Sequence, residues 1–217
     1  MIPPLTYDPP SNPITEIHRD DDLLVVDKPA GLLSVPGKAV EHADCLLARL
    51  QAIDPAVRLV HRLDMDTSGV MVFARNPSAQ RHLGLQFERR HLQKSYVARV
   101  HGSPDELSGV VVLPLIADWP NRPLQKVCHD TGKPALTEWR VLQSGPCSRL
   151  LLKPATGRSH QLRVHMAAMG HAICGDRFYG SAEVRCCTDR LYLHASELAL
   201  RHPDGGAWHT FKSDVPF

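Results

Sequence analysis

One polar segment between two apolar runs constrains this chain more than any other feature of its sequence. Residues 61–69 hold two carboxylates, an arginine and two hydroxyls, and they end in a glycine. Residues 57–60 before them and 70–74 after them are apolar or β-branched runs of strand length. Burying a polar corner between core strands costs free energy unless its groups are paired. A solvated hairpin corner is the simpler interpretation, and a functional corner is the alternative.

Five motifs in one order favour the functional interpretation. They are KPAGL at 28–32, HRLD at 61–64 with TSG at 67–69, KSY at 94–96, TGRSHQLR at 156–163 and LYLHA at 191–195. Together they resemble the motif series of the RluA family of pseudouridine synthases. Several ordered motifs are far more specific than one short pattern. Within the family, GLLSVPG at 31–37 and DWPNRP at 118–123 resemble the dual-specificity members most.

The resemblance assigns roles to the polar corner and its surroundings. It implies that Asp64 is the catalytic carboxylate and that Arg163 is its salt-bridge partner, which would offset the tendency of a carboxylate in a dry pocket to protonate. Tyr96 would stack on the target base, and a strand tyrosine half in the core is the alternative. Arg62 would fill the gap that a flipped nucleotide leaves, and a surface pair with Asp66 is the alternative.

Four further residues are expected at the RNA or at the base. Lys94 and Arg158 are predicted to contact phosphates, and His160 is interpreted as structural or RNA-contacting. Leu193 is expected to line the uracil pocket, and core packing suits it equally well.

The same resemblance implies a reaction without a cofactor. Pseudouridine formation breaks the N1–C1′ bond of uridine and rejoins the base through C5, and it consumes neither a redox equivalent nor a phosphate. The sequence has no dinucleotide-binding or P-loop motif. Its thirteen histidines show no zinc-ligand spacing, and His160 and His165 are five residues apart. We therefore predict neither cofactor nor metal.

The distribution of charge suggests where RNA binds. Residues 1–60 carry five Lys and Arg against nine Asp and Glu, whereas the remainder carries 20 against 14. Residues 75–99 hold six basic residues and one acidic one. This pattern is typical of a phosphate-contacting surface, although a solvated helix face fits it nearly as well.

The order of elements predicts an α+β fold with a mixed, largely antiparallel sheet and flanking helices, and it resembles the pseudouridine synthase catalytic domain. Residues 1–13 include five prolines and are expected to be an extended arm that is poorly ordered unless it docks. Residues 14–217 are expected to form a single catalytic domain, with no room for an S4-type RNA-binding domain before Lys28. The expected helices are 45–53, one from Asn76 and Pro77, and one capped by Ser159 and ending at Met169; residues 114–135 are expected to be a loop.

Composition and motifs also indicate where the protein is located and what it binds. No apolar run approaches the ~20 residues of a membrane span, the start has no signal peptide, and the six cysteines lack C-x-x-C spacing. We expect a cytoplasmic monomer with free thiols, whose partner is an RNA stem-loop.

Three alternatives to a dual-specificity enzyme remain open. The resemblance implies action on a loop of large-subunit ribosomal RNA and on a tRNA anticodon stem-loop, and a synthase with a single rRNA or tRNA target is the nearest alternative. A non-catalytic RNA-binding module would not need Asp64. A hydrolytic glycosidase needs two carboxylates flanking the bond, but Asp64 and Asp66 would face opposite sides of an extended segment.

Overall fold

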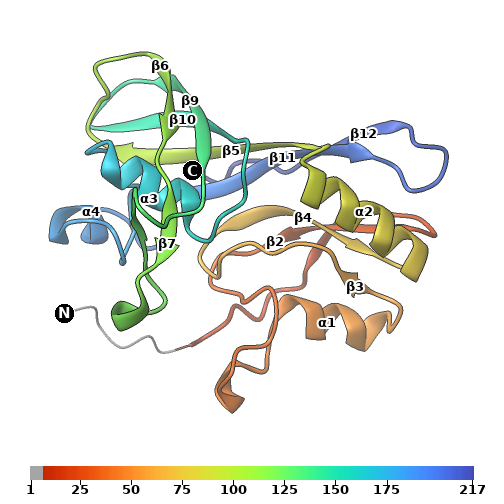
Figure 1. Ribbon diagram of the computed structural model, residues 1–217. Coiled ribbons are helices and arrows are strands. Elements are labelled where there is room, and N and C mark those ends of the chain that lie inside the picture. Colours follow the sequence, from red (N-terminus) through yellow and green to blue (C-terminus); the bar gives the residue numbers. More distant parts are fainter. Residues whose placement is uncertain (1–6) are drawn as a thin grey trace. The chain divides into compact units, whose positions relative to one another are not determined.

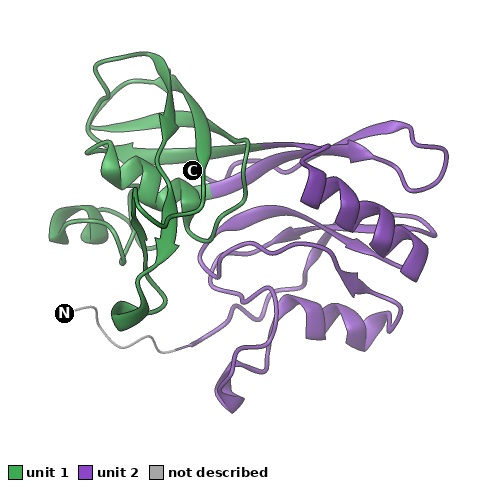
Figure 2. Cartoon of the chain, viewed as in Figure 1, with its two compact units in different colours: residues 1–2, 95–193, 217 green, residues 3–94, 194–216 purple. Residues whose placement is uncertain are grey.

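The computed structural model describes residues 7–217 of this 217-residue chain. These residues form two compact units, each coloured separately in Figure 2. The described part of unit 2 comprises residues 7–94 and 194–216, and that of unit 1 comprises residues 95–193 and Phe217. Neither unit is one continuous stretch, because residues 194–216 complete the unit that the first part of the chain begins. The single catalytic domain over residues 14–217 stays a prediction.

Unit 2 is built on a mixed sheet with two α-helices (Figure 1). Its elements are β1 (Thr15–Arg19), β2 (Leu23–Lys28), η1 (Val40–His42), α1 (Leu46–Ile53), β3 (Arg58–Leu59), β4 (Ser68–Ala74), α2 (Pro77–Arg89), β11 (Leu193–Arg201, whose first residue belongs to unit 1) and β12 (Trp208–Lys212). The strands are ordered β1-β2-β4-β11, with β3 also on β4 and β12 also on β11. All these pairs are antiparallel except β4 with β11, which is parallel.

The sequence pattern explains why α2 lies on this sheet. Alternate residues of β2, β4 and β11 are apolar and form one buried cluster with two α2 residues, Ala79 and Leu83. The helix begins as predicted: Pro77 is its first residue, and the Asn76 side chain accepts a hydrogen bond from the Ala79 amide at 2.8 Å. The predicted helix over 45–53 is also confirmed as α1, with Cys45 as its N-cap.

Unit 1 is an antiparallel sheet with α3 packed against it. Its elements are β5 (Gln93–His101, whose first two residues belong to unit 2), β6 (Ser108–Val112), β7 (Leu115–Ala117), η2 (Trp119–Asn121), β8 (Gln125–Val127), β9 (Leu136–Gln143), β10 (Cys147–Pro154), α3 (Gln161–Ala168) and α4 (Ala182–Cys186). The strand order is β5-β10-β9-β6, and β7 pairs with β8 in a separate hairpin. Leu162 and Met166 of α3 pack with Leu150 and Leu152 of β10 in one core cluster.

Two expectations about unit 1 were wrong. The segment 114–135 is not a structureless loop, because it contains the β7–β8 hairpin; its strands are three residues each, too short for a period-2 pattern to be recognised among polar residues. Helix α3 is not capped by Ser159. Its N-cap is His160, which has a left-handed backbone (φ 53°) and makes no side-chain cap bond.

The first residues that the structure describes are docked onto unit 2. The Tyr7 hydroxyl donates to the Asp44 carbonyl oxygen at 2.8 Å and accepts from the Leu33 amide at 3.1 Å. The Pro10 carbonyl oxygen accepts from Arg49 at 2.6 Å. Residues 1–6 of the expected arm lie outside the described residues. Over residues 7–217, no helix is both long enough and apolar enough to cross a lipid bilayer.

Candidate active site

The polar segment singled out in the sequence forms a turn that leads into β4. The Thr67 amide donates to the Asp64 carbonyl oxygen at 3.1 Å, with Met65 and Asp66 at the centre of the turn. The expectation of an extended segment was therefore wrong. The argument that Asp64 and Asp66 must face opposite sides loses its basis, because period-2 alternation holds only in a strand.

A buried lysine anchors this turn from β2. The Lys28 ammonium is fully buried and donates to the carbonyl oxygens of Pro29 (2.8 Å), Met65 (2.9 Å) and Thr67 (2.9 Å). An ammonium has three donors, and these three carbonyl groups take all of them. The lysine of the KPAGL motif thus holds the backbone of the turn that carries Asp64, a role the sequence alone did not reveal.

Hydrogen bonds also hold the residues that precede Asp64 in the sequence. The buried Ser34 hydroxyl donates to the Leu63 carbonyl oxygen at 2.7 Å and accepts from the Leu63 amide at 3.1 Å. His61 Nε2 accepts a hydrogen bond from the Val72 amide at 3.1 Å, and its ring stacks on Phe87 at 4.5 Å. Desolvation, helped by the nearby Lys94 charge, lowers the pKa of His61 to about 3, so the ring is neutral and able to accept.

The last residues of the segment, Ser68 and Gly69, pack closely against β11. Gly69 has φ +114°, and a Cβ placed on it would lie 2.3 Å from the Ala195 carbonyl oxygen. Only glycine allows this close approach of two parallel strands. Next to it, Ser68 Oγ lies 2.8 Å from His194 Nδ1 in a buried hydrogen bond. The TSG and LHA motifs are therefore joined in space although 126 residues separate them.

Asp64 is half-buried and Arg62 is exposed. Both interpretations of Arg62, the gap-filling role and the surface pair with Asp66, stay predictions. Lys94, also in unit 2, is half-buried, and desolvation reinforced by the Arg90 charge lowers its pKa to about 8. The turn thus presents an accessible carboxylate with an arginine whose side chain reaches solvent.

The last arginine of the TGRSHQLR motif is held by a carboxylate that the sequence analysis missed. Arg163 is buried, and its Nε and Nη2 donate to the two oxygens of Asp176 at 2.8 Å and 2.7 Å. Asp176 is also fully buried and accepts from the amides of Phe178 (2.9 Å) and Tyr179 (3.1 Å). Such a bidentate pair fixes the guanidinium plane. The pairing of Arg163 with Asp64 stays a prediction.

His160 is fixed by the loop that follows Asp176. Its Nδ1 lies 2.7 Å from the Tyr179 hydroxyl, which accepts from the Gln125 amide at 2.9 Å and can therefore donate to the ring. The His160 ring stacks on Phe178 at 5.6 Å. The sequence offered no signal for Tyr179, because a tyrosine outside every motif has no distinguishing neighbour.

The other polar residues of the TGRSHQLR motif form hydrogen bonds with one another and with the neighbouring backbone. Thr156 donates to Gln161 Oε1 at 2.6 Å, and Gln161 Nε2 donates to the Leu136 carbonyl oxygen at 2.9 Å. The Arg158 amide also donates to Gln161 Oε1, at 3.1 Å, and its side chain donates to the Pro134 carbonyl oxygen at 3.2 Å. Arg158 is thus oriented but remains partly exposed.

Tyr96 and Leu193 belong to one apolar neighbourhood of unit 1. Leu193 is buried in the core cluster, and the partly buried Tyr96 packs against that cluster. This position agrees with core packing for Leu193 and leaves part of the Tyr96 side chain accessible. Within residues 7–217, no group of three or more His, Cys, Asp and Glu side chains is arranged to hold a metal ion.

Comparison with known proteins defines the class to which this fold and site correspond. Residues 22–168 match the RNA pseudouridylate synthase family, and the chain belongs to that family. It is therefore an isomerase that forms pseudouridine in RNA. This finding removes the support for a hydrolytic glycosidase and for a non-catalytic RNA-binding module.

Individual relatives resemble the chain over nearly its full length. The dual-specificity RNA pseudouridine synthase RluA of Escherichia coli (strain K12) is 53% identical over 214 residues, 97% of this chain and 98% of that protein. The protein of the same name from Vibrio vulnificus is 52% identical over 92% of this chain and 82% of its own length. The solved structure of human RNA Pseudouridylate Synthase Domain Containing 1 has a TM-score of 0.81 and 30% identity, covering 97% of this chain and 87% of that one. The predicted α+β fold of the pseudouridine synthases is confirmed.

Proposed function

We propose that this isomerase uses Asp64 as its catalytic carboxylate on a uridine flipped out of an RNA stem-loop. The observation that carries the proposal is the turn over residues 64–67, whose backbone is held by the buried Lys28 ammonium. A catalytic carboxylate needs a fixed position and access to substrate. Asp64 has a backbone anchored on both sides and a half-buried side chain.

The chemistry requires an ionised carboxylate at the sugar. Breaking the N1–C1′ bond leaves an electron-poor C1′, which a carboxylate can attack as a nucleophile, and the same carboxylate can instead take a sugar proton. In either route the base turns and C5 bonds to C1′, while the bond between the carboxylate and C1′ breaks or the abstracted sugar proton is returned. The C5 proton is then lost and N1 gains one, so the product has the same composition as the substrate. Arg163 is proposed to keep Asp64 ionised, and its rigid pairing with Asp176 would fix the direction of that charge.

The remaining residues are proposed to bind the flipped nucleotide and its surroundings. Tyr96 would stack on the uracil above the Leu193 cluster, and Arg62 would occupy the vacated position in the RNA stack. Lys94, Arg158 and His160 would contact phosphates or sugars around it.

The substrates are proposed to be a loop of large-subunit ribosomal RNA and a tRNA anticodon stem-loop. The relatives from Escherichia coli and Vibrio vulnificus carry "dual-specificity" in their names, and their similarity to this chain supports the same property here. We propose further that the enzyme acts as a cytoplasmic monomer, without metal or cofactor.

Two experiments test these proposals. In the first, release of tritium from RNA carrying 5-labelled uridine is measured for Asp64→Asn and, as a matched control, for Asp66→Asn in the same turn. Asp64→Asn should lose several powers of ten in rate and retain RNA binding, whereas Asp66→Asn should remain active. Normal turnover by Asp64→Asn would refute its catalytic role.

The second experiment addresses the substrates. Pseudouridine is mapped in ribosomal RNA and tRNA from cells with and without this protein. Loss of sites in both RNA classes is expected. Loss in one class alone would replace dual specificity by a single target.

A further inference from the structure

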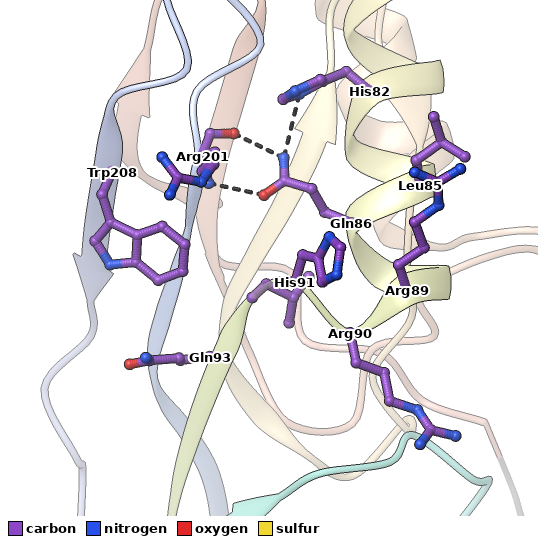
Figure 3. A pocket seen from close by; sticks show the side chains of 10 residues that line it. His82, Leu85, Gln86, Arg89, Arg90, His91, Gln93, Arg201 and Trp208 are labelled. Carbon is purple, nitrogen blue, oxygen red and sulfur yellow. Dashed lines mark hydrogen bonds between the residues drawn. The ribbon is translucent and has the colours of Figure 1, made fainter.

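A basic groove lies where α2 ends, within unit 2, and none of the proposed catalytic residues lines it (Figure 3). Its volume is about 560 Å³. The lining residues come from α2, the segment between α2 and β5, the start of β5 and the β11–β12 hairpin. They include Gln86, Arg89, Arg90, His91, Arg201 and Trp208. We propose that this groove binds a second, unreacting nucleotide of the RNA, with its base on Trp208 and its phosphates on the arginines.

The charge of the groove suits a polyanion. Arg89, Arg90 and Arg201 are permanent cations with exposed side chains, and no carboxylate is among the lining residues. Two further lining positions are histidines, whose ring nitrogens can form hydrogen bonds with phosphate groups. Most contacts between proteins and nucleic acids are made by such groups to phosphate oxygens.

An aromatic ring is available for the base. Trp208 is 45% exposed although it is a large apolar side chain. It is the cross-strand partner of Arg201, whose guanidinium carbon lies 5.7 Å from the ring centre. Stacking of an unpaired base on an aromatic ring, next to a cation that meets the phosphate, is how many proteins hold single-stranded RNA.

The two walls of the groove are clamped together, so the site exists before RNA arrives. The buried Gln86 side chain of α2 donates to the Arg201 carbonyl oxygen and accepts from the Arg201 amide, both at 2.8 Å. Figure 3 shows this pair of hydrogen bonds between Trp208 on one side and His91 and Arg89 on the other. A preformed site loses less conformational entropy on binding.

The backbone of Arg90 gives an independent reason to assign a function to its side chain. Arg90 is the C-cap of α2 and has left-handed dihedral angles (φ 60°, ψ 33°), where glycine is strongly favoured. Strained backbone conformations cluster at functional sites, so this conformation supports a role of the Arg90 side chain in binding. The structural alternative is that Arg90 stabilises the C-terminus of α2 by its positive charge. Arg89, in the last turn of the helix, already supplies such a charge.

Affinity for an unmodified tRNA transcript tests the proposal. The double variant Arg89→Gln/Arg90→Gln should weaken binding about tenfold at 0.1 M salt and reduce the slope of log K against log salt by about 0.7 for each lost contact. Arg140→Gln/Arg185→Gln removes the same two charges from exposed positions outside the groove and should change neither quantity. Equal effects of the two double variants would overturn the proposal.

One further variant separates the effect on RNA binding from an effect on folding. Arg90→Gly relieves the left-handed strain, so it should raise Tm while weakening RNA binding. Unchanged RNA affinity in Arg90→Gly would remove Arg90 from the site. Because kcat at saturating RNA reports on Asp64 and Kd reports on the groove, failure of this proposal is distinguishable from failure of the proposed function.

Fluorescence identifies the occupant. Quenching of tryptophan emission by a short oligouridylate is compared between the parent protein and Trp208→Phe, with oligoglutamate as an acidic peptide of similar charge. We expect oligouridylate alone to quench, and Trp208→Phe to lose that quenching. Quenching through Trp208 by oligoglutamate and not by oligouridylate would make the groove a peptide site and refute the proposal.

Discussion

The Lys28 ammonium donates to the Thr67 carbonyl oxygen at 2.9 Å, at the far end of the turn that begins with Asp64. Lys28→Met should leave three carbonyl groups without their donor and lower the free energy of unfolding by about 3 kcal/mol or more, since each unsatisfied buried group costs about 1–3 kcal/mol. We expect kcat to fall more than KM rises, because the turn would lose its fixed geometry. Denaturant unfolding and steady-state kinetics measure both, with the exposed Lys38→Met as the control. Stability equal to that of Lys38→Met would refute this role.

Arg163 should be important for both stability and pH dependence. Arg163→Met leaves the buried Asp176 carboxylate without its partner and should destabilise the protein by about 3–5 kcal/mol. The double variant Arg163→Met/Asp176→Asn should recover much of that loss, because no uncompensated charge remains. In Arg163→Met the acid limb of the pH–rate profile should move to higher pH, since removal of a positive charge favours protonation of a nearby carboxylate. An equal fall in rate at every pH would show that Arg163 is structural only.

Arg62 should assist the flipping of the uridine out of the RNA and not the isomerisation itself. Flipping a uridine out of a stacked loop costs a few kcal/mol, and an arginine that fills the vacancy offsets part of this. Arg62→Ala should therefore slow single turnover on a folded stem-loop by about 10- to 100-fold, and slow it much less on an unstructured oligonucleotide of the same local sequence. Arg58→Ala, also exposed, is the control. Equal losses on both RNAs would mean that Arg62 supports Asp64 directly.

Lys94 should make RNA binding sensitive to mildly alkaline pH. Its pKa is lowered to about 8, so the side chain is cationic at pH 7 and loses its charge as pH rises through 8. Phosphate binding favours the charged form, so affinity should fall by up to about tenfold per pH unit above pH 8. Lys94→Arg stays charged and should remove that dependence. Measuring Kd from pH 7 to 9 for both proteins tests this, and parallel profiles would exclude Lys94 from the phosphate contacts.

Local features of the fold were accessible from sequence because they depend on near neighbours. Asn76 caps α2 through the amide three residues ahead, and Pro77 fixes the first helical residue. The apolar runs of β2 and β4 and the stripe of Ala79 and Leu83 likewise depend on residues only a few positions apart. The motif order identified the family for the same reason: each motif is a short, continuous string.

Only the tertiary structure decided how those strings form a site, because the partners lie far apart in the chain. Lys28 binds carbonyl groups 37 and 39 residues away, and Ser68 bonds to His194 across 126 residues. The Asp176 partner of Arg163 lies outside every motif, and a lone aspartate carries no sequence signal. Hydrogen bonds of this kind satisfy backbone and charged groups that burial strips of water. Which groups are buried together is a property of the packed chain, so sequence determined the residue types and tertiary structure determined their pairing.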